Sequence, residues 1–139
     1  NPGQKENKWC GKCAKCAFVY MSLFPFIPYE RMIEIFGTDF YTKSEIEPHI
    51  RDLAGLGDHK PFDCVGTQDA TRLAIGMAIK RYKAENKNIP QFLLEAQEKI
   101  SRDSQMTQEL EKNLMKKWGE NYLPAKYVQI LKEAVNERA

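Results

Sequence analysis

The sequence predicts an all-α protein, in which an N-terminal cysteine knuckle is followed by about six to seven packed helices. Apolar residues recur at helical spacing along most of the chain. No alternating run rich in Val, Ile and Thr is bounded by turn residues, as a strand would be. The 139 residues are 42% apolar, which is enough for one hydrophobic core, so we expect a single helical domain over residues 1–139.

Each expected helix has an apolar stripe and recognisable ends. The stripes predict helices over residues 14–24, 29–36, 44–56, 68–86, 90–102, 107–118 and 124–138. Pro25 and Pro28 close the first helix because proline cannot continue one, and Gly37 ends the second. Pro48 is tolerable only in the first turn of the third helix. Thr67 is the expected N-cap of the fourth helix. The last three helices are expected to pack on the core as ordinary surface helices.

Three cysteines within seven residues, Cys10, Cys13 and Cys16, predict a metal site in the segment 1–28. A tight turn at Gly11 aims the first two thiols to one side, and Cys16 returns one helical turn after Cys13. Zinc is the favoured ion, and an iron–sulfur cluster is the main alternative because ferredoxin-type sites use the same spacing. Candidates for the fourth zinc ligand are Cys64, His59, His49 or a residue upstream of Asn1.

A second cluster of reactive side chains lies between Gly57 and Thr67, in a stretch without helical or alternating periodicity. Within six residues this loop carries an imidazole, an amine, a carboxylate and a thiol, from His59, Lys60, Asp63 and Cys64. Such groups suit proton transfer. The alternative is a structural loop in which Phe62 and Val65 fill the core and Cys64 is buried or binds the metal. Residues 68–139 form the helical remainder.

Composition and missing motifs exclude several classes of protein. The formal charge of +2 gives no electrostatic footprint for nucleic acid, and no apolar run is long enough to span a membrane. No phosphate-binding glycine loop or dinucleotide fingerprint is present. The chain starts at Asn1 without a signal segment, so we expect a cytoplasmic protein and the trimmed end of something longer.

Three sequence blocks carry a family resemblance. They read WCGKCAKCAFVY at residues 9–20, EIFG at 34–37 and GDHKPFDCVG at 57–66. In order and spacing they resemble the C-terminal part of the UDP-N-acetylmuramoyl-L-alanyl-L-glutamate epimerase family, over roughly residues 8–80. The knuckle is also similar to the zinc site of 7-cyano-7-deazaguanine synthases, where a fourth cysteine precedes it. That ligand would lie just before Asn1 and would leave Cys64 free for chemistry.

The resemblance implies an isomerase of peptidoglycan biosynthesis that inverts the terminal L-glutamate of a UDP-N-acetylmuramoyl-dipeptide. It implies that ATP and magnesium are bound by the family's own N-terminal nucleotide domain, so the isolated chain is expected to be inactive. By analogy, Cys64 is a candidate catalytic base or acid, and His59 is either its modulator or the opposite catalytic partner. Lys60 is a candidate contact for a substrate carboxylate or phosphate. The alternative function is a non-catalytic, zinc-stabilised helical module that docks a partner through an exposed apolar patch at residues 24–28.

Overall fold

The computed structural model describes residues 9–59, 66–102 and 122–136, and every regular element in these ranges is a helix. The elements are α1 (Ala14–Leu23), α2 (Tyr29–Phe36), the short 3₁₀ helix η1 (Phe40–Thr42), α3 (Glu47–Leu53), α4 (Gln68–Ala84), α5 (Gln91–Arg102) and α7 (Ala125–Asn136). The all-α prediction is confirmed. The helix expected over residues 107–118 lies outside the described residues.

The helix ends follow the signals in the sequence, except around α3. At the start of α4, the Thr67 hydroxyl accepts the N–H of Ala70 at 3.2 Å, as an N-cap does. The expected helix over 44–56 shortens to α3 because turns close both of its ends. At the C-terminal end, the N–H groups of Leu56 and Gly57 both donate to the Arg51 carbonyl and turn the chain away.

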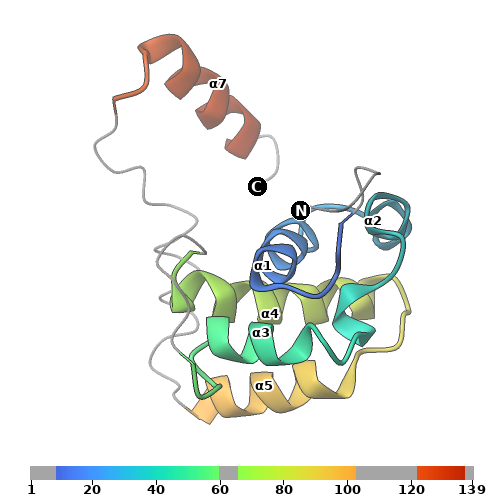
Figure 1. Ribbon diagram of the computed structural model, residues 1–139. Coiled ribbons are helices and arrows are strands. Elements are labelled where there is room, and N and C mark those ends of the chain that lie inside the picture. The colour runs from blue at the N-terminus through green and yellow to red at the C-terminus, as the bar shows by residue number, and fades with distance from the viewer. Residues whose placement is uncertain (1–8, 60–65, 103–121, 137–139) are drawn as a thin grey trace.

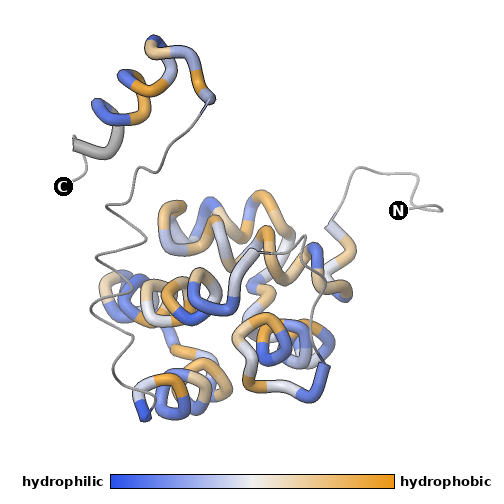
Figure 2. The backbone as a smooth tube through the Cα atoms, turned by 90° about the vertical axis from the view of Figure 1, so that its left-hand side faces the viewer, coloured by the Kyte–Doolittle hydropathy of each residue, from blue (hydrophilic) through white to orange (hydrophobic). Residues whose placement is uncertain are grey.

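Five of the helices form one body. Figure 1 shows α3, α4 and α5 running side by side, with α1 and α2 seen nearly end-on above them. Helix α4 contacts α1, α3 and α5, and α1 also contacts α3. Figure 2 shows hydrophobic positions on every one of these helices, and their inner faces supply the core. None of the helices in the described ranges has the length and apolarity needed to cross a membrane.

A buried carboxylate joins three segments of this body. One oxygen of Asp39 accepts the hydroxyl of Tyr20 on α1 at 3.0 Å and the N–H of Tyr41 at 2.9 Å. Its other oxygen accepts the hydroxyl of Tyr82 on α4 at 2.5 Å. Burial, followed by the negative charge of Asp39, raises the pKa of the Tyr20 and Tyr82 phenols well above their ordinary value. Both hydroxyls therefore stay protonated and serve as donors.

Replacing Asp39 by alanine is expected to lower the free energy of unfolding by at least about 3 kcal/mol, because three buried donors lose their acceptor. Urea unfolding would measure the loss, and Asp58→Ala, at an exposed position, should change stability by no more than about 0.5 kcal/mol. Equal stability of the Asp39 variant and the wild type would contradict this role.

The raised phenol pKa values also mean that the free energy of unfolding falls as the pH rises above about 10, where tyrosines of the unfolded chain ionise.

Two surface features differ from expectation. Helix α7 forms where predicted, but its large apolar side chains Tyr127, Ile130 and Leu131 are exposed, whereas α5 buries its apolar stripe. The segment 24–28 is not a continuous apolar patch, because the Phe24 ring is completely buried in the core and only Phe26 is a large exposed apolar residue. The sequence alone did not distinguish these two rings.

Candidate metal centre and reactive loop

The three knuckle thiols converge on one point at the start of α1. The sulfur of Cys10 lies 3.4 Å from that of Cys13 and 3.3 Å from that of Cys16, and all three lie within 4.8 Å of one another. Their burial is graded, since Cys13 is exposed, Cys10 is half-buried and Cys16 is buried. Convergent thiols of this kind can hold a soft metal ion such as zinc. The predicted clustering of the three cysteines is confirmed.

The turn that brings the thiols together depends on Gly11. Its φ of +60° lies in the left-handed region, which favours glycine. A side chain there would also collide with its surroundings, because a Cβ atom would lie 2.9 Å from the Lys43 ammonium and 3.1 Å from the Phe40 ring. From α3, the His49 Nε2 atom lies 3.1 Å from the carbonyl oxygen of Lys12. The knuckle is thus held by the elements that follow α2.

Burial governs the electrostatics of the Cys16 thiol. Burial raises the pKa of the Cys16 thiol to about 11, with the Gly11 backbone opposing the rise and the thiols of Cys10 and Cys13 adding to it. Metal binding at Cys16 therefore has to displace a proton, which makes the affinity depend on pH.

The structure narrows the candidates for a fourth ligand. In the described ranges, the group of converging metal-binding side chains contains the three cysteines alone. His49 is bonded to the Lys12 carbonyl, and His59 is paired with Asp52, so neither belongs to that group. Cys64 and the residues before Trp9 lie outside the described residues.

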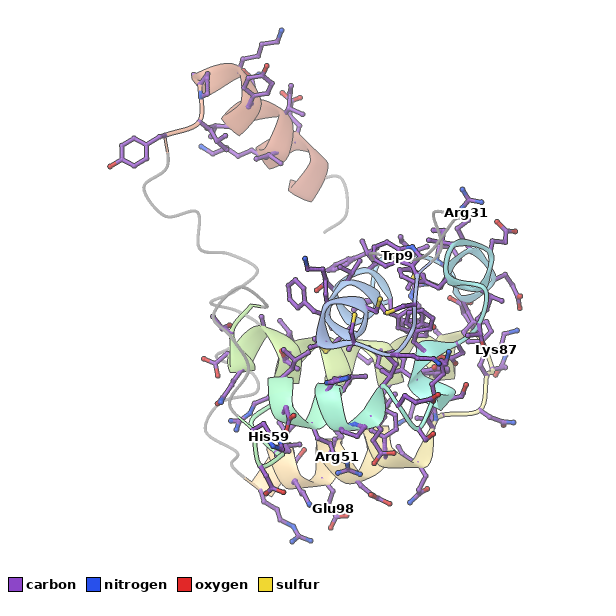
Figure 3. All side chains as sticks on the ribbon, in the orientation of Figure 1. Trp9, Arg31, Arg51, His59, Lys87 and Glu98 are labelled. Carbon is purple, nitrogen blue, oxygen red and sulfur yellow. The ribbon has the colours of Figure 1, made fainter. Side chains whose placement is uncertain are left out.

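His59 lies at the exposed end of the reactive loop. In Figure 3 it is found beyond the C-terminal end of α3, well separated in the view from Trp9 next to the knuckle. Its side chain is 87% exposed, and its Nδ1 atom lies 3.7 Å from a carboxylate oxygen of Asp52. The imidazole is therefore accessible to a substrate. Lys60, Asp63 and Cys64 lie outside the described residues, so their place relative to His59 stays a prediction.

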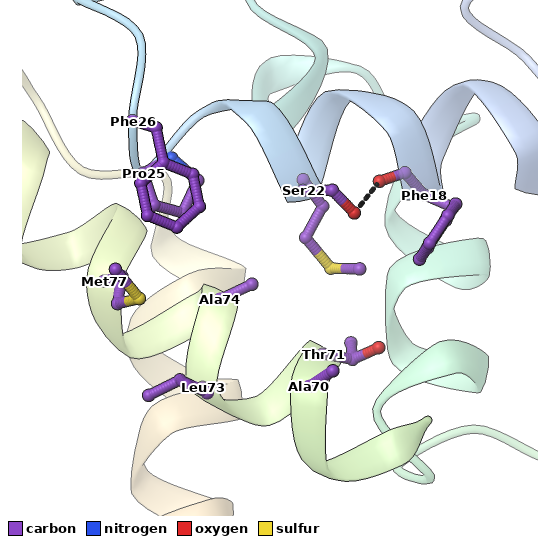
Figure 4. Close-up of a pocket in the computed structure, with 10 residues that line it drawn as sticks. Phe18, Ser22, Pro25, Phe26, Ala70, Thr71, Leu73, Ala74 and Met77 are labelled. Atoms are coloured by element: carbon purple, nitrogen blue, oxygen red, sulfur yellow. Dashed lines mark hydrogen bonds between the residues drawn. The ribbon is translucent and has the colours of Figure 1, made fainter. Parts of the chain in front are cut away.

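A pocket of about 200 Å³ lies between α1 and the first half of α4. Apolar side chains dominate its lining, including Phe18, Phe26 and Met77 (Figure 4). Its two hydroxyl groups are both engaged, since Ser22 donates to the Phe18 carbonyl at 2.8 Å and Thr71 donates to the Thr67 carbonyl at 3.1 Å. Among the described residues that line this pocket, none carries a charged side chain for an anionic substrate.

Sequence reasoning missed two side chains near these clusters. Asp52 lies beside His59, seven residues further along the chain. The sequence indicates this contact only through Gly55 and Gly57, which allow the chain to turn back. Lys43 reaches the knuckle from 32 positions beyond Gly11, and no local pattern marks that approach.

Curated proteins from three organisms are similar in sequence to part of this chain. Curated relatives named "UDP-N-acetyl-alpha-D-muramoyl-L-alanyl-L-glutamate epimerase" come from Micromonospora sp., Salinispora tropica and Xanthomonas oryzae pv. oryzae. The first is 33% identical over 91 residues, which is 66% of this chain and 20% of the relative. The second is 39% identical over 72 residues (52% and 16%), and the third is 33% identical over 95 residues (68% and 21%).

The chain thus spans about a fifth of the length of these relatives. No solved structure matches it significantly. The family model for the MurL C-terminal domain matches residues 2–110, a range that includes the cysteine knuckle and the reactive loop and ends before α7. The chain therefore belongs to the MurL C-terminal domain family.

Proposed function

We propose that this chain is the C-terminal part of an enzyme that inverts the terminal L-glutamate of a UDP-N-acetylmuramoyl-L-alanyl-L-glutamate precursor in peptidoglycan synthesis. The observation that carries the proposal is the family match over residues 2–110, together with three relatives named for this epimerase. The accessible imidazole of His59, within the block GDHKPFDCVG, supports a proton-transfer role for the loop.

Inversion at the α-carbon requires removal of a proton from one face and its return on the other. ATP and magnesium, bound by the rest of the enzyme, would activate the glutamate carboxylate and so make the neighbouring α-proton more acidic. Within this chain, His59 and Cys64 are the proposed acid–base pair, because an imidazole and a thiol both exchange protons near neutral pH. Lys60 is proposed to contact a carboxylate or phosphate of the substrate.

The knuckle is proposed to hold a structural zinc ion in a cytoplasmic protein. Three converging thiols fit that ion, and the burial of Cys16 suits a site that stabilises the fold. The patch of the alternative docking module is smaller than the predicted segment 24–28, because Phe24 belongs to the core while Phe26 is exposed.

The purified 139-residue chain alone is expected neither to hydrolyse ATP nor to epimerise a glutamyl dipeptide precursor, because no phosphate-binding motif is found in its sequence. A longer enzyme that joins this chain to the rest of the epimerase sequence should convert the L-glutamyl substrate in the presence of ATP and magnesium. Chiral analysis of the glutamate released from the product would measure epimerisation, and an assay of ATP consumption would measure ATP hydrolysis. Activity of the isolated chain, after controls for contamination, would contradict the proposal that the rest of the enzyme binds ATP. Inactivity of a folded longer enzyme on this substrate would contradict the function.

A further inference from the structure

The Asp52 carboxylate accepts a hydrogen bond from the His59 backbone and lies close to the His59 ring, at a distance beyond that of a hydrogen bond. Asp52 lies in the last turn of α3 (Glu47–Leu53), and its side chain is 19% exposed where that of His59 is 87% exposed. Its Oδ1 atom accepts the backbone N–H of His59 at 3.3 Å, and its Oδ2 atom lies 3.7 Å from Nδ1 of the imidazole. One fixed carboxylate therefore faces both the backbone and the ring of a residue in the reactive loop.

The turn after α3 packs closely against the Asp52 carboxylate at Gly57. A Cβ atom at Gly57 would lie 2.0 Å from Asp52 Oδ1 and 3.0 Å from the Asp52 backbone nitrogen. The N–H groups of Leu56 and Gly57 close the turn on the Arg51 carbonyl at 2.8 and 3.1 Å. A side chain at position 57 would push the carboxylate away from His59, so the glycine is part of the arrangement.

We propose that Asp52 is a positioning residue that fixes the orientation and the tautomer of the His59 imidazole, an inference that rests on the proposed proton-transfer role of His59. A carboxylate facing Nδ1 favours the neutral ring that carries its proton on Nδ1. The lone pair of Nε2 then points away from Asp52 toward solvent or substrate. An imidazole held in this way is ready to accept a proton at one defined atom.

The second histidine of the chain supplies an internal reference. His49 Nε2 lies 3.1 Å from the Lys12 carbonyl oxygen, and a carbonyl oxygen only accepts hydrogen bonds. His49 therefore carries a proton on Nε2. The structure thus assigns opposite neutral tautomers to the two histidines of the sequence, and one spectrum of the intact chain can report both.

Ring ¹⁵N shifts of the labelled 139-residue chain, recorded at about pH 8 where imidazoles are neutral, test the assignment. We expect mainly the Nδ1–H form at His59 and the Nε2–H form at His49. Asp52→Asn should shift His59 to mainly Nε2–H and leave His49 unchanged. The asparagine oxygen can still accept the His59 N–H, so unchanged backbone amide shifts would show that the turn survives. Asp58→Asn, which removes an exposed neighbouring charge, should leave the His59 tautomer unaltered.

A wild-type His59 that is mainly Nε2–H, or a tautomer that Asp52→Asn does not change, would overturn the proposal. In the longer enzyme, Asp52→Asn should lower kcat by about tenfold or more with little change in KM, and Asp52→Glu should recover part of the loss. If the tautomer shifts as expected while kcat stays constant, the hold of Asp52 on the ring stands and the catalytic role of His59 is wrong. The two failures are therefore distinguishable.

Discussion

Removing the metal from the Cys10, Cys13 and Cys16 site is expected to lower the Tm of the chain by about 10–15 °C. The metal ion binds the folded state only. A free-ion concentration a thousandfold above the Kd therefore raises the free energy of unfolding by about 4 kcal/mol. For a chain of this length, each kcal/mol shifts the Tm by roughly 3–4 °C. The loss should concentrate near the knuckle, so hydrogen exchange should accelerate over residues 9–28, while α5 stays protected.

Metal analysis of protein purified under reducing conditions would show whether zinc is present. Cys16→Ser should lose the metal and reproduce the lower Tm, because this buried thiol adjoins the Cys10 sulfur at 3.3 Å. Ser22→Ala, on the same helix but away from the thiols, is the matched control and should keep the metal. Iron with a brown chromophore, or no metal at all, would contradict the zinc site.

Replacing Cys64 by serine in the longer enzyme is expected to abolish epimerisation, with a loss in kcat of about 100- to 10,000-fold. Loss of a general acid or base has an effect of this size, and a serine hydroxyl does not ionise near neutral pH as a thiol does. Exchange of the substrate α-proton with deuterated solvent, followed by mass spectrometry, would show whether one face of the α-carbon has lost its proton-transfer group.

The same variant separates catalysis from metal binding. Zinc content and Tm should equal those of the wild type if Cys64 is free for chemistry. A variant that loses its zinc would identify Cys64 as the fourth ligand, and a variant with full activity would remove it from the reaction. Cys13→Ser is the matched control, since it should lose metal affinity through a thiol that the structure places in the knuckle.

The helices were predictable where local signals agree with packing. Helix α2 begins and ends as predicted because Pro28 precedes it and Gly37 adopts the left-handed conformation that ends it. Thr67 marks the start of α4 through its own side chain. The sequence did not reveal η1, since three residues are too few to carry a periodic pattern. It also did not show that the apolar side chains of α7 are exposed, because an amphipathic pattern does not indicate which surface, if any, covers the apolar face.

The candidate site was predictable only where its members are close in sequence. Cys10, Cys13 and Cys16 converge because a glycine turn and one helical turn suffice to bring them together. The carboxylate that pairs with His59 escaped prediction because a turn of the chain, and not a regular period, brings Asp52 beside it. Contacts such as that between Asp39 and Tyr82 join positions 43 residues apart, and only the packing of the helices sets them.

The bonds of Asp39 to Tyr20 and Tyr82 limit how α1 and α4 can move relative to each other. Helix α1 starts at the knuckle and α4 starts at the end of the reactive loop, and the buried carboxylate ties the two helices together. Sliding one helix past the other would leave a buried tyrosine hydroxyl without its acceptor, at a cost of about 1–3 kcal/mol. Asp39 therefore joins α1 and α4 through Tyr20 and Tyr82, which lie in the C-terminal halves of the two helices.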